Sequence, residues 1–335
     1  MANNKRPWLR YLKHDPLPWI LDEAPVWARP RIYTDLLDRP PDDQEFLEVR
    51  SAALAHPQVQ NLIQKAAHWP GDPITRHNDA KHIIHTLGFL ADIGLTKDDP
   101  GMDQVVSALL AHRSPEGVFN SLVLVPKAFG GSGEETLSWM LCDSPTVLQA
   151  LARYGLADHP YVHQAADYLV SIIRQNGWPC AASPEFGKFR GPGRKDDPCP
   201  YANLIAVRAL ALIPSYAKQD ILGNGVEMML DHWENQKERK IYMFGIGTTF
   251  RALKYPLIWY DILHVVDTLS LLPFTHDDPR FKQMLQVIID SGDEGGRFKA
   301  GSVWRAYKDW EFGQKRTPST WLTIIVLTIL KRINK

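Results

Sequence analysis

A repeated order of residues, a polar loop followed by a helix that is apolar on nearly every side, constrains this fold most strongly. In the segment 191–214, a loop rich in glycine and proline places Asp197 and Cys199 at the start of a helix with apolar residues at helical spacing. A helix that is apolar nearly all round must be surrounded by other protein. The same order recurs in the segments that begin at Leu141, Lys254 and Lys315.

Amphipathic helices alternate with these apolar helices along the chain. Their ends are marked by glycine and by proline, which cannot continue a helix. The pattern predicts helices over approximately residues 7–13, 25–39, 43–54, 56–68, 77–93, 102–111, 142–155, 161–174, 199–213, 216–234, 255–272 and 279–290, and from 318 to the end of the chain.

Two concentric rings suit six apolar helices and about six amphipathic helices. The apolar helices of the inner ring are surrounded by protein, and each amphipathic helix of the outer ring faces water on one side. The repeat period of about 45 to 65 residues lies near the upper end of helical-repeat lengths. We therefore predict an all-α (α/α)6 barrel, or toroid, that forms one domain over residues 1–335, with residues 1–20 packing on the ring. In such a barrel the polar helix starts converge at one end of a central cavity.

The charge balance and the cysteine count restrict the partners and the compartment. The chain has 38 Lys and Arg and 38 Asp and Glu, so its formal net charge is zero, and no nucleic-acid partner is indicated. The longest apolar run, Trp321–Leu330, is too short to span a bilayer, so we expect no integral membrane segment. Three cysteines fit a reducing compartment, with free thiols or metal ligands, and we expect a cytoplasmic protein. The sequence indicates no particular oligomeric state.

Three segments resemble repeat units of the prenyltransferase and squalene-cyclase superfamily, the α/α toroids. They read PSTWLTIIVLTILK, DSPTVLQALARYGL and DDPCPYANLIAVRALALIP. The chain is similar in particular to a group of small prokaryotic toroid proteins. It differs from squalene-type cyclases in lacking their DxDD acid motif, and of their repeat motif only a glycine with an aromatic neighbour is present, as in Asn176-Gly177-Trp178.

Asp197-Pro198-Cys199 resembles the protein prenyltransferases, which place two zinc ligands at the start of an inner helix. The resemblance implies a third ligand, a histidine that begins a later inner helix. The matching region reads KYPLIWYDILH, and we expect His264 to lie well inside that helix, which leaves the triad incomplete. The cofactor prediction is therefore none or zinc, with Asp197, Cys199 and Cys142 as candidate ligands.

The free amides and the dipole at a helix N-terminus favour anions such as the carboxylate of Asp197 and the thiolate of Cys199. These residues therefore fit a zinc ligand pair or an activated nucleophile. The alternative is that an aspartate caps the helix and Cys199 packs as a small apolar residue.

Cys142 and Asp143 hold the corresponding place one repeat earlier, so two thiols are predicted to face each other across the cavity. With an acid and a histidine they fit a tetrahedral metal site, or a proton donor and acceptor pair. Helix capping by Asp143 is the alternative. We interpret Cys180, in the loop WPCAASPEFG, as incidental.

Tyr260, Asp261 and His264 are predicted on one inner helix, with Tyr260 and His264 on the same face. A buried aspartate must find a partner or stay protonated, which makes Asp261 a candidate general acid. A structural hydrogen bond between helices is the alternative. His77, near Asp79, is predicted at the cavity, whereas histidines on a helix are more often surface or core residues.

Aromatic side chains are the candidate substrate-binding residues. In a toroid they hold an isoprenoid chain or stabilise a carbocation through their π faces, and the alternative is core filling. The basic loop is a candidate phosphate or carboxylate site, or simply a solvated loop. The residues are Trp27, Tyr33, Trp259, Tyr260 and Trp321 for the aromatic set and Arg190, Arg194 and Lys195 for the loop.

Two hypotheses of function follow. The first is an enzyme with an apolar central cavity that acts on an isoprenoid-like or other unsaturated hydrophobic substrate by acid–base chemistry. Such an enzyme would be an isomerase, a lyase of the hydratase or dehydratase type, a terpenoid cyclase or, with zinc, a prenyltransferase. The second is a noncatalytic toroid that binds a lipid-like ligand or a partner protein. A third reading, glycan cleavage by two carboxylates, is disfavoured by the thiols.

Overall fold

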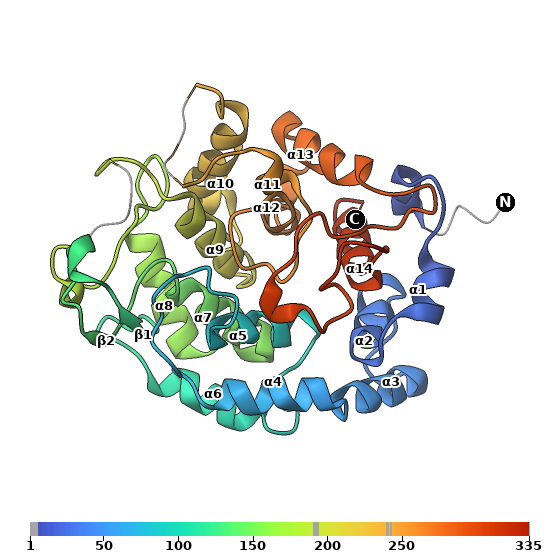
Figure 1. Cartoon of the computed structure of the whole chain (residues 1–335), viewed down its shortest axis with the longest axis horizontal. Helices are drawn as coiled ribbons and strands as arrows, with labels where there is room; N and C mark the ends of the chain where they lie inside the picture. Colours follow the sequence, from blue (N-terminus) through green and yellow to red (C-terminus); the bar gives the residue numbers. More distant parts are fainter. Residues whose placement is uncertain (1–5, 190–193, 239–240, 242, 335) are drawn as a thin grey trace. The chain divides into compact units, whose positions relative to one another are not determined.

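The chain is almost entirely helical in the computed structural model, which describes residues 6–189, 194–238, 241 and 243–334 (Figure 1). The predicted fold class, an all-α chain of the toroid type built from helical hairpins, is confirmed. The α-helices in these residues are α1 (Leu17–Glu23), α2 (Arg29–Arg31), α3 (Gln44–Leu54), α4 (Pro57–Ala67), α5 (Ile83–Asp92), α6 (Met102–Ala111), α7 (Ser144–Leu151), α8 (Pro160–Ser171), α9 (Pro200–Ala211), α10 (Gln219–Glu234), α11 (Thr248–Arg251), α12 (Ile262–Leu269), α13 (Pro279–Asp290) and α14 (Thr320–Arg332).

Contacts divide the chain into two compact units. The central unit comprises Asn61–Ile246, and the terminal unit comprises Met1–Gln60 with Gly247–Lys335. The prediction of one domain over the whole chain stays a prediction. None of the helices in the described residues combines the length and apolarity needed to cross a membrane, and the cytoplasmic location also stays a prediction.

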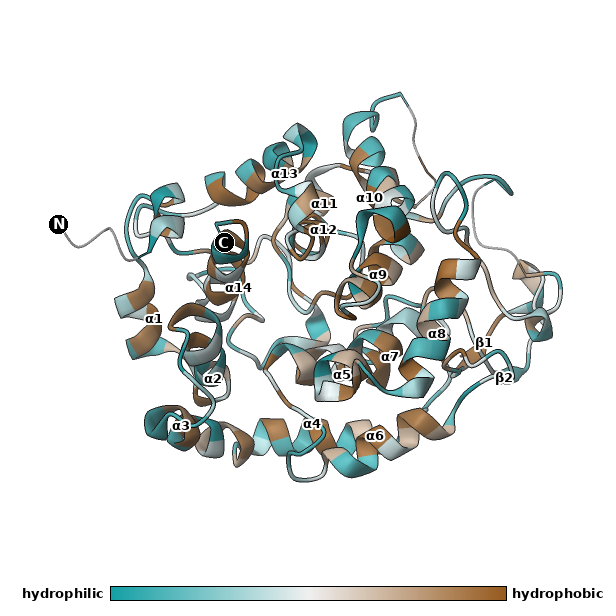
Figure 2. Cartoon of the chain, turned by 180° about the vertical axis from the view of Figure 1, so that it is seen from behind, coloured by the Kyte–Doolittle hydropathy of each residue, from teal (hydrophilic) through white to brown (hydrophobic). Residues whose placement is uncertain are grey.

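In the central unit, α7 lies between α5 and α9, and α8 and α10 pack on their outer sides (Figure 1). Every residue from Pro200 to Leu210 of α9 is buried, and Figure 2 shows hydrophobic residues along α7 and α9. Burial on all sides explains why the sequence of α9 has no polar face. The inner helices of this unit are therefore the apolar ones that the sequence predicts.

Asn203 is one of the two polar residues on the buried stretch of α9, and its side chain binds backbone groups of the preceding loop. Its Oδ1 accepts from the Trp178 N–H at 2.8 Å, and its Nδ2 donates to the carbonyls of Trp178 at 2.9 Å and Cys199 at 2.8 Å. Gly177 has a φ of +98°, and a Cβ there would lie 2.3 Å from Asn203 Oδ1. Asn203 therefore fixes the loop around Trp178 against the start of α9.

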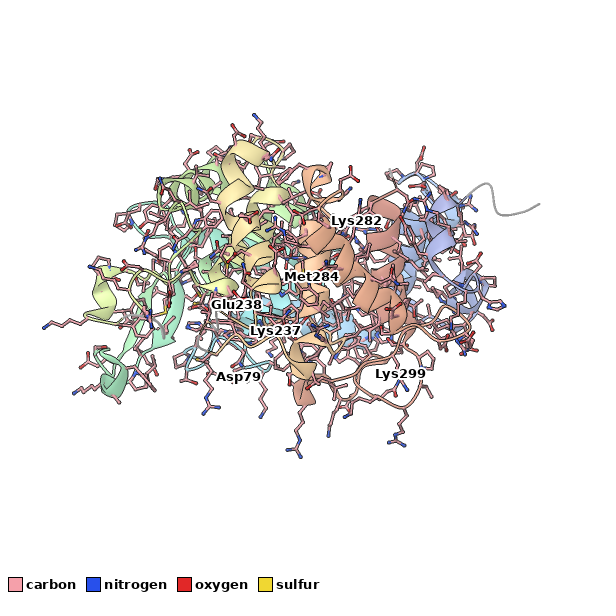
Figure 3. All side chains as sticks on the ribbon, turned by 90° about the horizontal axis from the view of Figure 1, so that it is seen from above. Asp79, Lys237, Glu238, Lys282, Met284 and Lys299 are labelled. Carbon is pink, nitrogen blue, oxygen red and sulfur yellow. The ribbon has the colours of Figure 1, made fainter. Side chains whose placement is uncertain are left out.

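The terminal unit has its own inner helices, α12 and α14, which contact each other, and an amphipathic outer helix, α13, which packs on α12. Met284 on α13 is fully buried, whereas the Lys282 amine pairs with Asp277 at 2.9 Å (Figure 3). The N-terminal 3-10 helix Pro7–Tyr11 and α1 contact α14.

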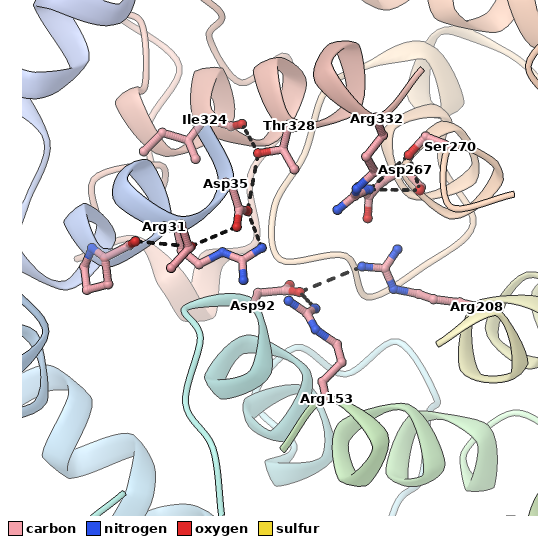
Figure 4. Close-up of polar contacts among 12 residues, drawn as sticks. Arg31, Asp35, Asp92, Arg153, Arg208, Asp267, Ser270, Ile324, Thr328 and Arg332 are labelled. Atoms are coloured by element: carbon pink, nitrogen blue, oxygen red, sulfur yellow. Dashed lines mark hydrogen bonds and ion pairs between the residues drawn. The ribbon is translucent and has the colours of Figure 1, made fainter. Parts of the chain in front are cut away.

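Arginine–aspartate pairs occupy the C-terminal ends of the inner helices (Figure 4). In the central unit, Asp92 at the end of α5 pairs with Arg153, which follows α7, and lies 3.8 Å from Arg208 in the last turn of α9. The three inner helices therefore run parallel, and the two arginines lie where the helix dipole favours cations. In the terminal unit, Arg332 at the end of α14 donates to Asp267 of α12 at 2.6 Å.

Three predicted elements differ from the structure. The long helix expected after Pro25 is split into a 3-10 turn, α2 and the π-helical turn Ile32–Leu36. The helix expected from His77 begins at Ile83, because the His82 side chain caps it by accepting from the Ile84 N–H. The helix expected from Tyr255 begins at Ile262, because Asp261 caps it.

A short antiparallel hairpin that the sequence did not predict lies in the central unit. Its strands are β1 (Ser121–Leu124) and β2 (Glu135–Ser138), with Ser121 opposite Ser138. The hairpin contacts the 3-10 turn Pro184–Phe186, which follows the Cys180 loop.

Replacing Asn203 with alanine should destabilise the protein by about 3 kcal/mol, because it removes three buried hydrogen bonds and leaves backbone groups unpaired. Urea unfolding followed by circular dichroism measures the loss. Asn224→Ala is the matched control, since Asn224 is exposed and donates to one carbonyl, that of Arg174 at 3.1 Å; its cost should stay below about 1 kcal/mol. Equal costs for the two variants would contradict the role assigned to Asn203.

Candidate functional site

Three cysteine thiols from separate loops lie together in the central unit. The Sγ atoms of Cys142, Cys180 and Cys199 are all within 4.8 Å of one another. None of the three forms a disulfide in the described structure; Cys142 and Cys199 are buried and Cys180 is half-buried. The interpretation of Cys180 as incidental is therefore wrong.

Backbone pairing on both sides of the Cys180 loop explains this arrangement. On one side the Leu141 N–H donates to the Ala181 carbonyl at 2.9 Å, and on the other the Cys199 N–H donates to the Trp178 carbonyl at 2.9 Å. The loop is thus held between the segment before α7 and the segment before α9. As a result, Cys180 lies beside Cys142 and Cys199.

The thiols hydrogen-bond to one another, and the pKa values of Cys142 and Cys199 are raised. Hydrogen bonds with Cys180 and Cys199, together with burial, raise the pKa of Cys142 well above its usual range. For Cys199, the hydrogen bond with Cys142 lowers the pKa, but the bond with Cys180 and burial outweigh it and raise the pKa to about 12. The thiols of Cys142 and Cys199 are therefore protonated at neutral pH and are weak nucleophiles in this state.

A histidine–aspartate pair lies next to the thiols. His77 Nδ1 is 2.8 Å from Asp143 Oδ1, and the Asp143 side chain is 1% exposed whereas that of His77 is 23% exposed. Burial lowers the pKa of His77, but the Asp143 charge and hydrogen bond, with a contribution from Cys180, outweigh it and raise the pKa. The second carboxylate oxygen, Asp143 Oδ2, is buried and has no hydrogen-bond partner among the described residues.

The pKa values of the other ionisable side chains around this pair are shifted so that their neutral forms are favoured. Burial first, then the charges of Asp143 and Cys142, raise the pKa of Tyr201 at the start of α9 well above its usual range. Burial lowers the pKa of His85 to about 3. The pKa of His82, the cap of α5, is also lowered by burial.

Asp197 lies outside the thiol cluster. Its carboxylate accepts from the Arg194 N–H at 3.1 Å within the exposed loop, and the cluster in the described residues consists of cysteines alone. The ligand set implied by the protein prenyltransferase resemblance is therefore not assembled. Arg194 and Lys195 are exposed, and Arg190 lies outside the described residues.

The second predicted centre, Asp261 with His264, lies in the terminal unit. Asp261 Oδ1 accepts from the His264 N–H at 3.0 Å, and His264 Nδ1 lies 3.0 Å from the carbonyl of Trp259. Asp261 Oδ2 is buried without a hydrogen-bond partner in the described part of the chain. Burial raises the pKa of Asp261 to about 7, although the His264 hydrogen bond and Lys254 lower it.

Two expectations about this centre are wrong. Tyr260 precedes α12, so it does not share a helix face with His264; its ring packs 5.5 Å from that of Phe250. His264 lies in the first turn of α12 and not deep inside the helix. Because the two centres belong to different units, the convergence of all helix starts on one cavity stays a prediction.

The predicted substrate-binding aromatics of the terminal unit pack mainly against protein. The Trp27 ring lies 5.1 Å from that of Trp321 and 5.1 Å from that of Trp310, and Trp27 and Trp321 are 2% and 1% exposed. The Tyr33 hydroxyl donates to Glu45 at 2.6 Å, and Trp259 is half-buried. Trp27 and Trp321 thus follow the core-filling alternative in this structure.

A pocket of about 230 Å³ lies beside the Cys199 loop in the central unit. It is lined by polar and acidic side chains of α10, and its lining includes Pro198 but none of the three thiols. The residues are Gln175, Asn176, Pro198, Asn224, Glu227, Met228, Asp231, His232 and Ile241.

No family model and no curated protein matches the chain. Among solved structures, ligand-free type II terpene cyclase MstE from Scytonema is similar at 16% identity and a TM-score of 0.43, over 91% of this chain and 86% of that chain. An unsaturated glucuronyl hydrolase specific for heparin is similar at 11% identity and a TM-score of 0.49, over 92% of this chain and 84% of that chain. Dfg5 from Chaetomium thermophilum in complex with glucosamine is similar at 12% identity and a TM-score of 0.45, over 94% of this chain and 80% of that chain. All three similarities are at 16% identity or less and at TM-scores below 0.5.

Asp261 should make the protein less stable as the pH rises from about 4 to about 7. Unfolded, the carboxyl titrates near its ordinary pKa of 3.8, and folded it titrates near 7. Between these values the folded state binds a proton that the unfolded state lacks, so the free energy of unfolding falls by about 1.4 kcal/mol per pH unit. Above pH 7 both states are ionised and this contribution becomes constant.

Asp261→Asn should remove this dependence while keeping a capping oxygen. From pH 4 to pH 8, the free energy of unfolding of the variant should rise relative to the wild type by about 4 kcal/mol in urea titrations. Asp278→Asn is the matched control, because Asp278 caps α13 and its pKa is lowered by Arg280; it should show no such rise. Parallel pH profiles for the wild type and Asp261→Asn would refute the raised pKa.

Proposed function

We propose that this protein is an acid–base enzyme whose catalytic base is His77, oriented by Asp143, and whose substrate is an unsaturated hydrophobic compound. The observation that carries the proposal is the 2.8 Å contact between His77 Nδ1 and a carboxylate that is 1% exposed. An ionised carboxylate only accepts hydrogen bonds, so it keeps the proton on Nδ1 and leaves Nε2 as the basic nitrogen.

We assign different roles to the two side chains of the pair: His77 meets the substrate, and Asp143 orients His77. His77 is half-buried and is the more accessible member of the pair, whereas Asp143 is enclosed. Tyr201 stays protonated at neutral pH, because burial and the neighbouring charges raise its pKa.

The reaction class follows from the strength of this base. Neutral imidazole removes a proton only from an activated carbon, such as one next to a carbonyl group. In an isomerisation, Nε2 accepts that proton, the electron pair moves through the conjugated system, and the proton returns to a different carbon. No oxidant or reductant is needed, and substrate and product have the same composition.

The apolar surroundings support a hydrophobic substrate. The helices next to the pair, α7 and α9, have buried and mostly apolar side chains along most of their length, and binding sites with apolar linings favour apolar ligands. An isoprenoid-like enone combines this character with an activated C–H bond.

A noncatalytic ligand-binding protein is the second candidate. The observation in its favour is the aromatic cluster of the terminal unit, in which Trp27 packs on both Trp310 and Trp321. Aromatic side chains can bind an apolar ligand without any catalytic group beside them.

Solvent deuterium incorporation tests the proposal directly. Isoprenoid β,γ-unsaturated ketones of different chain lengths are incubated with the full-length protein in D₂O, and mass spectrometry measures the deuterium gained. His77→Asn and Asp143→Asn should each lower the exchange rate at least 100-fold, since general acid–base groups contribute 10²- to 10⁴-fold.

His68→Asn and Asp158→Asn are the matched controls, because both residues are exposed in the same unit, and they should keep the wild-type rate. Saturable binding of these ketones without exchange would support the noncatalytic candidate. Exchange that persists in His77→Asn would remove His77 as the base.

A further inference from the structure

We propose that Cys142, Cys180 and Cys199 bind one zinc ion through their thiolates, with a nitrogen or oxygen ligand in the fourth position. This site goes beyond the acid–base proposal, because its three sulphur ligands have no part in that reaction and because zinc binding is measured without a substrate. It also differs from the set predicted from the sequence, since Cys180 replaces Asp197.

The spacing of the three sulphur atoms is close to that of a tetrahedral zinc site. Zn–S bonds of about 2.3 Å place neighbouring sulphur atoms about 3.8 Å apart. The three Sγ atoms lie within 4.8 Å of one another, so binding requires movements of about 1 Å. Rotations of the cysteine side chains supply movements of this size, and the backbone can stay in place.

The backbone arrangement makes the cluster preformed. Hydrogen bonds hold the Cys180 loop to the Cys142 segment on one side and to the Cys199 segment on the other. Asn203 adds bonds to Trp178 and to the Cys199 carbonyl. Few residues therefore need to become ordered when the metal binds, which increases affinity.

A second, independent observation comes from the groups around the thiols. Asp143 is the residue after Cys142, is 1% exposed, and has one carboxylate oxygen without a partner. Its other carboxylate oxygen lies 2.8 Å from Nδ1 of His77. A histidine held by a carboxylate is the usual companion of metal ligands, as a ligand itself or as a neighbour of the bound water.

The ligand chemistry selects the metal. Thiolates prefer zinc, copper(I) and iron–sulphur clusters over magnesium or calcium. The 335 residues contain three cysteines, whereas iron–sulphur clusters are commonly held by four. Three sulphur ligands with one nitrogen or oxygen ligand are typical of zinc.

Metal content and ligand type test the site. The full-length protein is purified anaerobically with a phosphine reductant and without chelators, and it is then loaded with one equivalent of zinc and gel-filtered. Elemental analysis should find one zinc per chain. Cobalt(II) in place of zinc should give sulphur-to-cobalt charge-transfer absorption, and X-ray absorption at the zinc edge should count three sulphur ligands.

Cys180→Ala is the informative variant, because Cys180 is half-buried and in a loop. It should weaken zinc binding at least tenfold in competition with a chromophoric chelator, while its circular dichroism matches that of metal-free wild type. Asp197→Asn is the control and should keep one zinc per chain, since this carboxylate binds the Arg194 N–H.

Three results would overturn the zinc site: no retained zinc in the reduced protein, one or no sulphur ligands in X-ray absorption, or unchanged affinity in Cys180→Ala. The sulphur count does not depend on any variant, so a misfolded variant leaves the test intact. If the protein catalyses deuterium exchange but binds no zinc, the zinc site is wrong and the acid–base proposal stands. If the protein binds zinc but catalyses no exchange, the acid–base proposal is wrong and the zinc site stands.

Discussion

Backbone pairing of one loop with two others is the interaction on which the chemistry of the central unit depends. The loop that contains Trp178 and Cys180 bonds to the segment before α7 and to the segment before α9. Asn203 extends this pairing from inside a helix that is otherwise apolar. A single buried amide thereby couples the position of a reactive loop to the packing of the core.

The inner helices of the central unit have different polar groups at their two ends. Thiols, His77 and Asp143 lie at the N-terminal ends, and the pairs of Asp92 with Arg153 and Arg208 lie at the C-terminal ends. Helix dipoles favour anionic groups at the first end and cations at the second. The direction of the helices thus determines at which end anionic groups are stabilised and at which end cations are stabilised.

The sequence predicts elements best where periodicity and caps agree. The approximate ranges 102–111 and 279–290 agree with the observed helices α6 and α13, because glycine or aspartate stands before each amphipathic stretch. The start of α12 was placed too early, because the apolar residues before this helix cannot be distinguished by periodicity from those inside it. The start of α5 was also placed too early, because the mostly polar residues 77–82 before it form turns and the cap. Asp261 was the signal that could have corrected α12, since an aspartate before an apolar run is a frequent cap.

The candidate site was predicted in part. Helical repeats placed Cys142 and Cys199 at corresponding positions, and the structure brings them together. Cys180 was missed because contacts between irregular loops have no periodic signal, although the loop WPCAASP precedes the Cys199 segment closely in the sequence. The pairing of His77 with Asp143 joins residues 66 positions apart, and nothing in either local sequence specifies the other.

The burial of α9 on every side has a consequence for the motions of the central unit. Its amide hydrogens can exchange with solvent only when α7 or α10 moves away from it, so this helix reports the rarest opening of the unit. Cys199 is the N-cap of the same helix. The opening that admits water to the middle of α9 is therefore larger than any loop fluctuation, and it approaches unfolding of the whole unit.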